Sequence, residues 1–320
     1  MLTKSSSQQN PQANASGQQF VLTLLTPNGK LHATIASRGA SLREFRIGNI
    51  ELVEPYDADS DAPLCAGKIM SPWVNRLDHG QWTYQGEVLH NPITLAEQDN
   101  SNHGLLLDYL YKEVDSSPTS VTLEAVIEPS EGYPFHVATR VTYELVTDGL
   151  VVTHRAANLS EVAAPYATGA HPYFKFSEVD AADLTVTLPA ATRTVVDKRQ
   201  IPVGEEPASA SGIDLAAGVR VGDHQIDDDF TDLIRDENGL AHTLILSADA
   251  RGLDVWQDSS FKHVVLFTPS FFPTIDGGRT HAVAVEPSTA APNAFNSGKN
   301  LIWLEPGAAF EGRWGVRVLL

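Results

Sequence analysis

The segment Ala164-Pro165-Tyr166-Ala167-Thr168-Gly169-Ala170-His171-Pro172-Tyr173-Phe174-Lys175-Phe176 is an apolar, aromatic-rich run with one histidine directly before a proline. A residue that precedes proline is driven out of the helical region toward extended geometry. The segment therefore predicts a strand or strand end that holds the His171 imidazole on a stiff backbone. A lone histidine in apolar surroundings is more often a core residue, here among Tyr166 and Tyr173, so its role depends on the rest of the chain.

Outward from this segment, the chain shows many short runs of alternating apolar and polar residues, separated by Gly, Asn and Pro. Period-two alternation with this punctuation is typical of antiparallel hairpins. The predicted strands are 20–25, 31–35, 41–47, 50–53, 81–84, 87–90, 121–127, 137–145, 150–157, 184–188, 243–247, 253–257, 263–268 and 313–319.

Helical periodicity is weak throughout, and only residues 69–74, 106–111 and 230–233 suggest short helical turns. Many strands without intervening helices predict an all-β protein, an antiparallel β-supersandwich with few short helices. Residues 192–221 are predicted to leave the sheets as a long excursion. Residues 20–320 are expected to form a single domain, after a Ser-, Gln- and Asn-rich tail at 1–19 that is expected to be disordered.

The composition narrows the range of partners. The 40 acidic and 22 basic residues give a net charge of −18, which repels nucleic acid and anionic membranes. Cys65 is the only cysteine, so neither an intrachain disulfide nor a cysteine zinc site is expected. Neither an apolar signal segment nor a membrane span of about 20 apolar residues is visible. These features favour a cytoplasmic protein with a small, neutral ligand.

Four further motifs accompany the His171-Pro172-Tyr173-Phe174 motif in the chain. Together and in this order they resemble the aldose 1-epimerases, or galactose mutarotases, from about residue 21 to residue 320. The other motifs are Ser71-Pro72-Trp73-Val74-Asn75-Arg76-Leu77, Asn102-His103-Gly104, Gly132-Tyr133-Pro134-Phe135 and Val285-Glu286-Pro287. The residues before Asn75 depart from the family's Gly-Arg-x-Ala-Asn-Arg form, and those after His103 also differ, so the sugar-facing wall is altered.

The resemblance implies a supersandwich isomerase that interconverts the α and β anomers of a free hexose such as galactose or glucose. It implies no cofactor and no metal, and a monomer or homodimer. Glu286 is the implied general base at the anomeric hydroxyl, His171 the general acid at the ring oxygen, and His103 a further hydrogen-bonding or acid group. The implied substrate contacts are Trp73, Asn75, Arg76, Tyr173 and Asp227.

The local sequence around Glu286 agrees with a base. Glu286 ends an apolar run and precedes a proline, so burial is expected to raise its pKa while a nearby Arg76 lowers it again. Nearby carboxylates are expected to keep His171 protonated near neutral pH. The plainer interpretation is a strand-end glutamate that faces water.

The sequence leaves two neighbouring residues as candidates for the sugar-binding aspartate. The run Ile226-Asp227-Asp228-Asp229-Phe230 contains three carboxylates, and the family places the ligand three residues before an aromatic side chain. This pattern selects Asp227, with Asp228 as the alternative. Trp256 and Phe295 are additional candidates for an aromatic platform under the sugar.

Several other functions fit parts of the pattern. A non-catalytic carbohydrate-binding β-sandwich would need no acid and base pair, and a hexose-phosphate mutarotase would need a basic cluster. Two histidines and a carboxylate also describe an iron or zinc site, although His103 and His171 lack the usual close spacing. A glycosidase would use two carboxylates.

Overall fold

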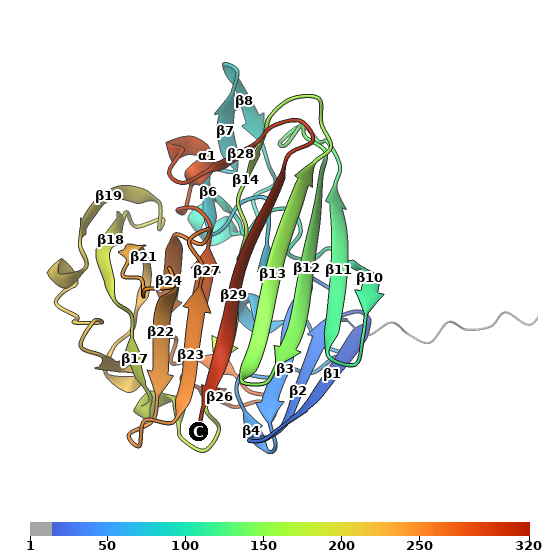
Figure 1. Cartoon of the computed structure of the whole chain (residues 1–320). Helices are drawn as coiled ribbons and strands as arrows, with labels where there is room; N and C mark the ends of the chain where they lie inside the picture. Colours follow the sequence, from blue (N-terminus) through green and yellow to red (C-terminus); the bar gives the residue numbers. More distant parts are fainter. Residues whose placement is uncertain (1–14) are drawn as a thin grey trace, which may run out of the picture.

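A nine-stranded antiparallel sheet forms one layer of the computed structural model, which describes residues 15–320 (Figure 1). Along β12 (Val137–Val146), buried residues alternate with exposed or half-buried ones, as expected for a sheet with one face on the core. The remaining strands, in sheet order around β12, are β10 (Lys112–Ser116), β11 (Ser120–Ile127), β13 (Gly149–Asn158), β29 (Ala309–Leu319), β23 (Gly252–Gln257), β22 (Ala241–Leu246), β17 (Thr185–Thr187) and β20 (Val219–Arg220).

A second, eight-stranded sheet packs behind the first. Every residue of its strand β27 (Val283–Ser288) is buried, because one face meets the core and the other meets polar side chains described below. The other strands are β19 (Pro202–Pro207), β18 (Ala190–Val196), β21 (Asp227–Leu233), β24 (His263–Phe267), β15 (Gly169–Ala170) and β5 (Ile69–Met70), with β16 (Tyr173–Phe174) also paired to β27.

Smaller sheets and short helices complete the fold. A four-stranded sheet contains β1 (Gln19–Thr26), β2 (Gly29–Ala36), β3 (Ser41–Ile47) and β4 (Ile50–Glu51), and its first two strands contact β12. Two-stranded pairs are formed by β6 (Arg76–Asp78) with β9 (Asn100–Asn102), β7 (Gln81–Tyr84) with β8 (Glu87–His90), β14 (Ala164–Tyr166) with β28 (Ile302–Leu304), and β25 (Phe272–Pro273) with β26 (Arg279–Thr280). The α-helix is α1 (Ala294–Ser297), and 3-10 turns occur at Pro63–Cys65, Ala96–Gln98, Ala181–Asp183, Ala208–Ser211 and Val221–Asp223.

The apolar core lies between the two large sheets. Phe230, Leu266 and Val285 point into it from neighbouring strands of the eight-stranded sheet, and each is at most 1% exposed. Tyr143 and Trp314 belong to the same core and come from the nine-stranded sheet. Large side chains of this kind supply most of the hydrophobic stabilisation of a domain. The predicted antiparallel supersandwich is therefore confirmed.

The predictions for individual segments were less accurate than the predicted fold class. Residues 230–233, predicted as a helical turn, belong to strand β21, and residues 69–74 begin with strand β5. Residues 106–111 form a turn and a bridge from Leu110 to Arg38. The predicted excursion at 192–221 contributes β19 and most of β18 to the eight-stranded sheet. Short apolar runs do not distinguish strand from helix by periodicity, which explains these errors.

The chain is ordered before the predicted boundary at residue 20. Ser16 is 2% exposed, and its hydroxyl donates to the backbone oxygen of Ala58 at 2.6 Å. Gln19 begins β1. Residues 1–14 of the expected tail lie outside the described residues. Within residues 15–320, helices are too short and polar to cross a bilayer.

Candidate active site

His171 and Glu286 face each other because of the strand register. Gly169 lies opposite Ser288, and Tyr173 lies opposite Ala284 on the same strand β27. The two pairings have the same register, so His171, in the unpaired step between β15 and β16, lies opposite Glu286. His171 Nε2 lies 3.2 Å from Glu286 Oε1. Both side chains are at most 7% exposed. The predicted acid and base are therefore in direct contact within the protein.

Both polar groups of the His171 backbone are hydrogen-bonded to one neighbouring segment. Its N–H donates to the Lys68 carbonyl at 3.0 Å, and its carbonyl accepts from the Gly67 N–H at 2.9 Å. The Tyr173 ring stacks on the imidazole, with 5.1 Å between ring centroids. This agrees with the rigid mount that the following proline predicts.

Strand alternation separates the two candidate aspartates. Asp229, Val265 and Glu286 form one cross-strand row, so Asp227, two residues earlier on β21, points to the same sheet face as Glu286. Asp228 points to the other face and pairs with Arg193 at 2.9 Å. Of the two aspartates, the structure therefore brings Asp227 to the site.

Arg76 joins this group through polar side chains. Its guanidinium Nη2 lies 3.9 Å from Asp227 Oδ2, and its Nη1 donates to Asn75 Oδ1 at 3.0 Å. Its Nε donates to Gln98 Oε1 at 2.6 Å. Asn75 thus orients the Arg76 guanidinium. Gln98 has the same role, which the sequence did not indicate.

His103 approaches His171 edge to face, with ring centroids 5.2 Å apart. Its backbone has a φ of +61°, an uncommon conformation for a residue with a side chain, and Gly104 follows at +84°. A Cβ on Gly104 would come within 2.1 Å of the Ser71 carbonyl oxygen, so only glycine allows this close approach. The left-handed turn therefore presents His103 to the site.

The predicted aromatic platforms are mostly buried supports. Tyr173 is 1% exposed and Trp73 is 2% exposed, with Trp73 packed edge to face on Phe295. Trp256 lies on β23 of the other large sheet, beneath the Arg317 guanidinium. These rings support the fold. The structure does not present them as open surfaces on which a sugar ring could stack.

Burial dominates the electrostatics of the acid and base pair. It raises the pKa of Glu286 well above 4.5, and Asp227 adds to this while Arg76 opposes it. Burial, with a smaller contribution from the Arg76 charge, lowers the pKa of His171 to about 4. Burial and the neighbouring His171 also hold the pKa of His103 well below 6.5. The direction for His171 is opposite to the expectation that nearby carboxylates keep His171 protonated near neutral pH, because desolvation disfavours the charged imidazolium.

Three buried polar atoms of the site have no hydrogen-bond partner within residues 15–320. They are His103 Nδ1, His171 Nδ1 and Glu286 Oε2. Buried polar groups are nearly always paired, so unpaired ones concentrated in one place indicate a site for a ligand rich in donors and acceptors. In the same described part of the chain, no group of three His, Cys, Asp or Glu side chains has the arrangement of a metal site.

A second residue that the sequence analysis missed holds the Gln98 segment in place. The Arg199 guanidinium donates to the backbone oxygens of Gln98 and Asp99, both at 3.0 Å, and to Asn100 Oδ1 at 2.8 Å. It also pairs with Asp78 at 2.8 Å. An arginine in a Gly- and Pro-rich stretch carries no sequence signal for this role.

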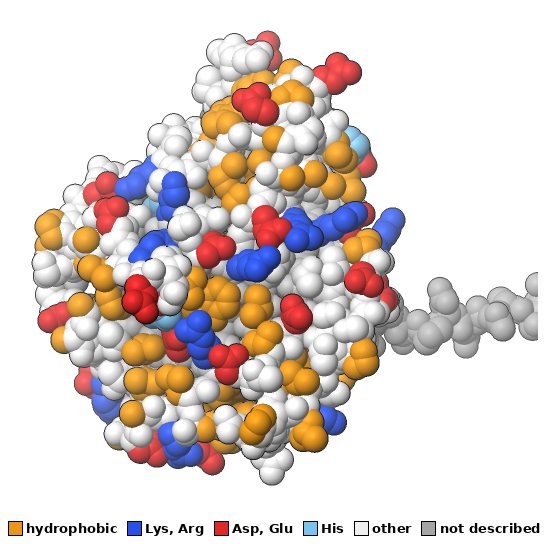
Figure 2. All heavy atoms as spheres, viewed as in Figure 1, with side chains coloured by type: hydrophobic (Ala, Val, Ile, Leu, Met, Phe, Trp, Pro, Cys, Tyr) orange, Lys and Arg blue, Asp and Glu red, His pale blue; other side chains and the backbone are white. Residues whose placement is uncertain are grey.

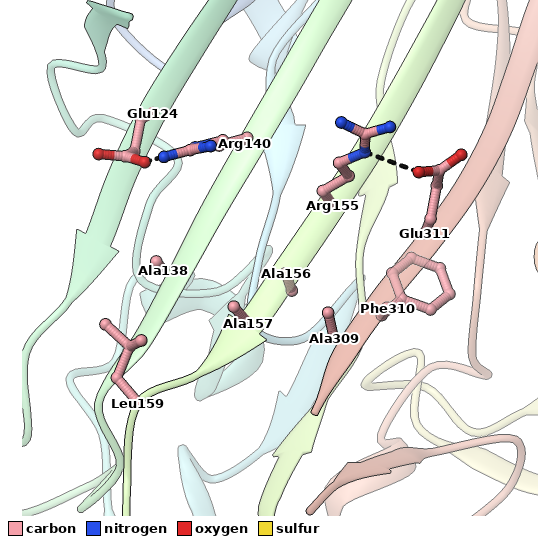
Figure 3. A pocket seen from close by; sticks show the side chains of 10 residues that line it. All are labelled: Glu124, Ala138, Arg140, Arg155, Ala156, Ala157, Leu159, Ala309, Phe310 and Glu311. Atoms are coloured by element: carbon pink, nitrogen blue, oxygen red, sulfur yellow. Dashed lines mark hydrogen bonds and ion pairs between the residues drawn. The ribbon is translucent and has the colours of Figure 1, made fainter. Parts of the chain in front are cut away.

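The surface offers a cavity away from these residues. A hollow of about 400 Å³ lies on the outer face of the nine-stranded sheet, and its lining includes Ala138, Ala157 and Ala309. Figure 3 shows the side chains that line it. Arg140 pairs there with Glu124, and Arg155 pairs with Glu311. Acidic and basic side chains are interspersed across this side of the molecule (Figure 2). The hollow shares no residue with the candidate site.

An antiparallel supersandwich with this arrangement of histidines, carboxylates and arginine defines a galactose mutarotase-like protein. The chain belongs to the aldose 1-epimerase family, whose model matches residues 22–316.

The comparisons with individual proteins agree with this family. The chain is 30% identical over 283 residues to the uncharacterized protein YihR of Escherichia coli K12, covering 87% of both chains. It is 30% identical over 165 residues to rat galactose mutarotase, which is 49% of this chain and 47% of that one. Among solved structures, a GalM/aldose epimerase homologue from C. elegans superposes with a TM-score of 0.80 at 18% identity, covering 95% of this chain and 100% of that one. Galactose 1-epimerase from Lactobacillus acidophilus gives 0.75 at 18% identity, covering 92% of each.

Proposed function

We propose that the protein is an aldose 1-epimerase that interconverts the α and β anomers of a free hexose such as galactose or glucose. The observation that carries the proposal is the buried contact of 3.2 Å between His171 Nε2 and Glu286 Oε1. Membership of the aldose 1-epimerase family supports an isomerase that acts on a sugar.

The reaction moves one proton between two oxygens of the same carbon. Glu286 removes the proton of the anomeric hydroxyl, His171 gives a proton to the ring oxygen, and the bond between C1 and the ring oxygen breaks to leave an aldehyde. Rotation about C1–C2 and the reverse proton transfers close the ring on the other face. Because both oxygens are bonded to C1, a donor and an acceptor in contact with each other match the reacting atoms.

The surrounding residues suit a neutral sugar. Asp227 keeps 39% of its side chain exposed and can accept from hydroxyls, while Arg76 steadies it. The cations near the pair already have acidic partners, Arg76 with Asp227 and Lys68 with Asp108. This favours a neutral monosaccharide over a sugar phosphate. The proton transfers need neither a cofactor nor a metal, so activity in excess EDTA is expected to equal that without it.

Anomer exchange of fresh α-galactose and α-glucose, followed by polarimetry or NMR with and without protein, tests the proposal. We expect an increase over the spontaneous rate that disappears in Glu286→Gln. Sugar binding without any acceleration would instead identify a carbohydrate-binding protein. Acceleration of hexose phosphates alone would identify a hexose-phosphate mutarotase.

A further inference from the structure

A small polar cavity of about 220 Å³ lies where strand β21 ends, beside the loop that follows α1. This volume is below the range of about 300–1,000 Å³ that is typical of sites for drug-sized ligands, so the cavity suits a small ion or a single polar group. Hydrogen-bonding and charged side chains make up most of its lining, namely Thr231, Asp232, Arg235, Ser259, Lys262 and Asn300. We refer to it as the Lys262 cavity.

The Lys262 cavity is positively charged, although the protein has a net charge of −18. The Arg235 guanidinium donates to three backbone oxygens at 2.8–3.2 Å, which fix its position without neutralising its charge. The exposed Lys262 ammonium has no ion-pair partner among residues 15–320. The one carboxylate of the lining, Asp232, accepts from the Thr192 hydroxyl at 2.6 Å. Two cations against one carboxylate favour an anionic ligand.

A buried histidine orients the Asn300 amide. His263 is 0% exposed, its Nδ1 lies 3.0 Å from Asp229 Oδ2, and its Nε2 lies 2.9 Å from Asn300 Oδ1. The Asp229 carboxylate favours the charged imidazolium, which donates from both ring nitrogens. Asn300 therefore accepts through Oδ1. Its Nδ2 group, which has no acceptor within residues 15–320, is left to donate to a ligand in the cavity.

The Lys262 cavity is distinct from the candidate active site, and the two share no lining residue. On the eight-stranded sheet, His263 lies opposite Ser288, two residues along from the pairing of Val265 with Glu286. His263 and Ser288 are both at most 2% exposed. A buried pair of residues therefore lies between the cavity and Glu286.

We propose that the Lys262 cavity binds a phosphoryl group, either of free phosphate or of a small phosphate monoester. Arg235, Lys262, the Asn300 amide and the Ser259 hydroxyl supply donors from four side chains, and hydrogen bonds from cations to an anion are the strong ones. A phosphoryl group presents three acceptor oxygens, more than a carboxylate, and so matches this set of donors. The site does not depend on the proposed function.

Calorimetric titration of inorganic phosphate into the full chain, at pH 7 and low ionic strength, tests the site. We expect saturable binding that Lys262→Met weakens about tenfold, the usual effect of losing a hydrogen bond to a charged group. Asn300→Asp should abolish binding, because a carboxylate then replaces the amide donor. Aspartate tolerates the φ of +56° at this position, so the backbone can remain unchanged.

The matched control is Lys112→Met, which removes the same charge from β10 of the other large sheet. An exposed charge far from the ligand contributes little, so this variant should change the phosphate affinity by less than about twofold. Absence of saturable phosphate binding would refute the site. Equal losses of affinity in Lys262→Met and Lys112→Met would refute it as well.

The ring of His263 reports where the anion binds. We expect phosphate to shift the His263 ring signals in ¹⁵N–¹H correlation spectra, and binding that leaves these signals unmoved would place the anion elsewhere and overturn the proposal. Glycerol 3-phosphate distinguishes the two sources of the group. With the same dependence on Lys262, affinity at least tenfold above that of phosphate identifies a monoester, and equal or lower affinity identifies free phosphate. No sugar reaction is followed, so failure of the site leaves the proposed epimerase intact.

Discussion

His171 and Glu286 behave as one titrating unit with a single proton between them. Burial raises the pKa of Glu286 and lowers that of His171, so it favours a protonated Glu286 beside a neutral imidazole over an ion pair. The proposed reaction needs the proton on His171. Sugar hydroxyls that donate to Glu286 stabilise its charged form and would drive this transfer as the substrate binds. The apparent pKa values of such a pair belong to the pair and not to either residue.

The pH profile of kcat/KM is expected to be bell-shaped. At low pH the pair takes up a second proton, on the imidazole, and loses its base, so the acidic limb should fall near pH 4. At high pH the pair loses its last proton and with it the acid, at a pH well above 4.5. Anomer exchange measured from pH 3.5 to 9 checks this. An acidic limb near the ordinary histidine value of 6.5 would contradict it.

Removing either member of the pair should lower turnover by about 10²–10⁴-fold, the usual contribution of a positioned proton donor or acceptor. Glu286→Gln keeps the shape but cannot take the proton, and His171→Asn cannot deliver one. Sugar affinity, measured by calorimetry, should change less than turnover in both variants. Asp227→Asn provides the contrast, since it should weaken binding at least as much as turnover. Near-full activity of Glu286→Gln would rule out the base assignment.

Elements far apart in the chain meet to hold Arg76. The turn between β18 and β19 carries Arg199, which fixes the 3-10 turn at Ala96–Gln98, and Gln98 in turn receives the Arg76 Nε–H. Asn100 returns a bond to the Arg199 carbonyl at 2.9 Å. Arg76 is therefore positioned by a hairpin at the edge of the eight-stranded sheet.

We expect Arg199→Met to raise KM for the sugar about three- to tenfold with a smaller change in kcat, because in the proposed function Arg76 and Asp227 bind hydroxyls and do not transfer the proton. Arg193→Met is the matched control, since Arg193 lies on β18 of the same hairpin and pairs with Glu206 on β19 and Asp228 on β21, and not with Gln98. Steady-state kinetics at pH 7 and the thermal midpoint of each variant check this. An equal rise of KM in both variants would contradict the positioning role.

The sequence sufficed for the fold class and for most of the site, but not for geometry that depends on register. Alternation identified long strands such as β12 and the motif order identified His171 and Glu286. Strands of two residues such as β5 carry no periodic signal, because their pairing is decided by neighbours distant in the chain. Asp227 and Asp228 are chemically identical in sequence, and only the pairing of β21 with β24 assigns them to opposite faces. The lowered pKa of His171 could not be predicted from the sequence, because it depends on how deeply the imidazole is buried in the folded protein.

At the scale of the whole molecule, buried polar pairs connect the strands beneath the site. His154 accepts from the Trp314 indole N–H at 3.0 Å and bonds the Thr168 hydroxyl at 2.8 Å, joining the nine-stranded sheet to the segment before His171. On the other side, His263 contacts Asp229 at 3.0 Å, and Asp229 accepts from the Thr194 hydroxyl at 2.6 Å. These contacts make the stability of the fold depend on pH independently of catalysis.

The His263 and Asp229 pair should stabilise the fold in a defined pH window. Burial alone would lower the pKa of His263, but the Asp229 carboxylate and hydrogen bonds to Asp229 and Asn300 raise it above 6.5. A raised folded-state pKa means that the folded protein binds more protons than the unfolded chain. The stabilisation is therefore fully present below the unfolded value of 6.5 and is lost as the pH rises through the folded-state pKa.

Asp229→Asn isolates this contribution. The substitution leaves His263 buried without its charge partner, and breaking such a pair typically costs about 3–5 kcal/mol of unfolding free energy. The difference between wild type and variant, from urea denaturation between pH 5.5 and 9, should be largest at the acidic end and shrink as the pH rises, because the wild-type pair then loses its imidazolium. Loss of the Asp229 charge also lowers the pKa of Glu286, so the pH dependence of the difference contains a second contribution, which the activity profile of the variant reports. Asp229 lies in the same cross-strand row as Glu286, and its charge helps to raise the pKa of Glu286. If the alkaline limb of the variant's activity profile moves toward lower pH, fold stability and catalysis are coupled through Asp229. A difference in unfolding free energy that stays constant over the whole pH range would show that His263 is neutral in the folded protein.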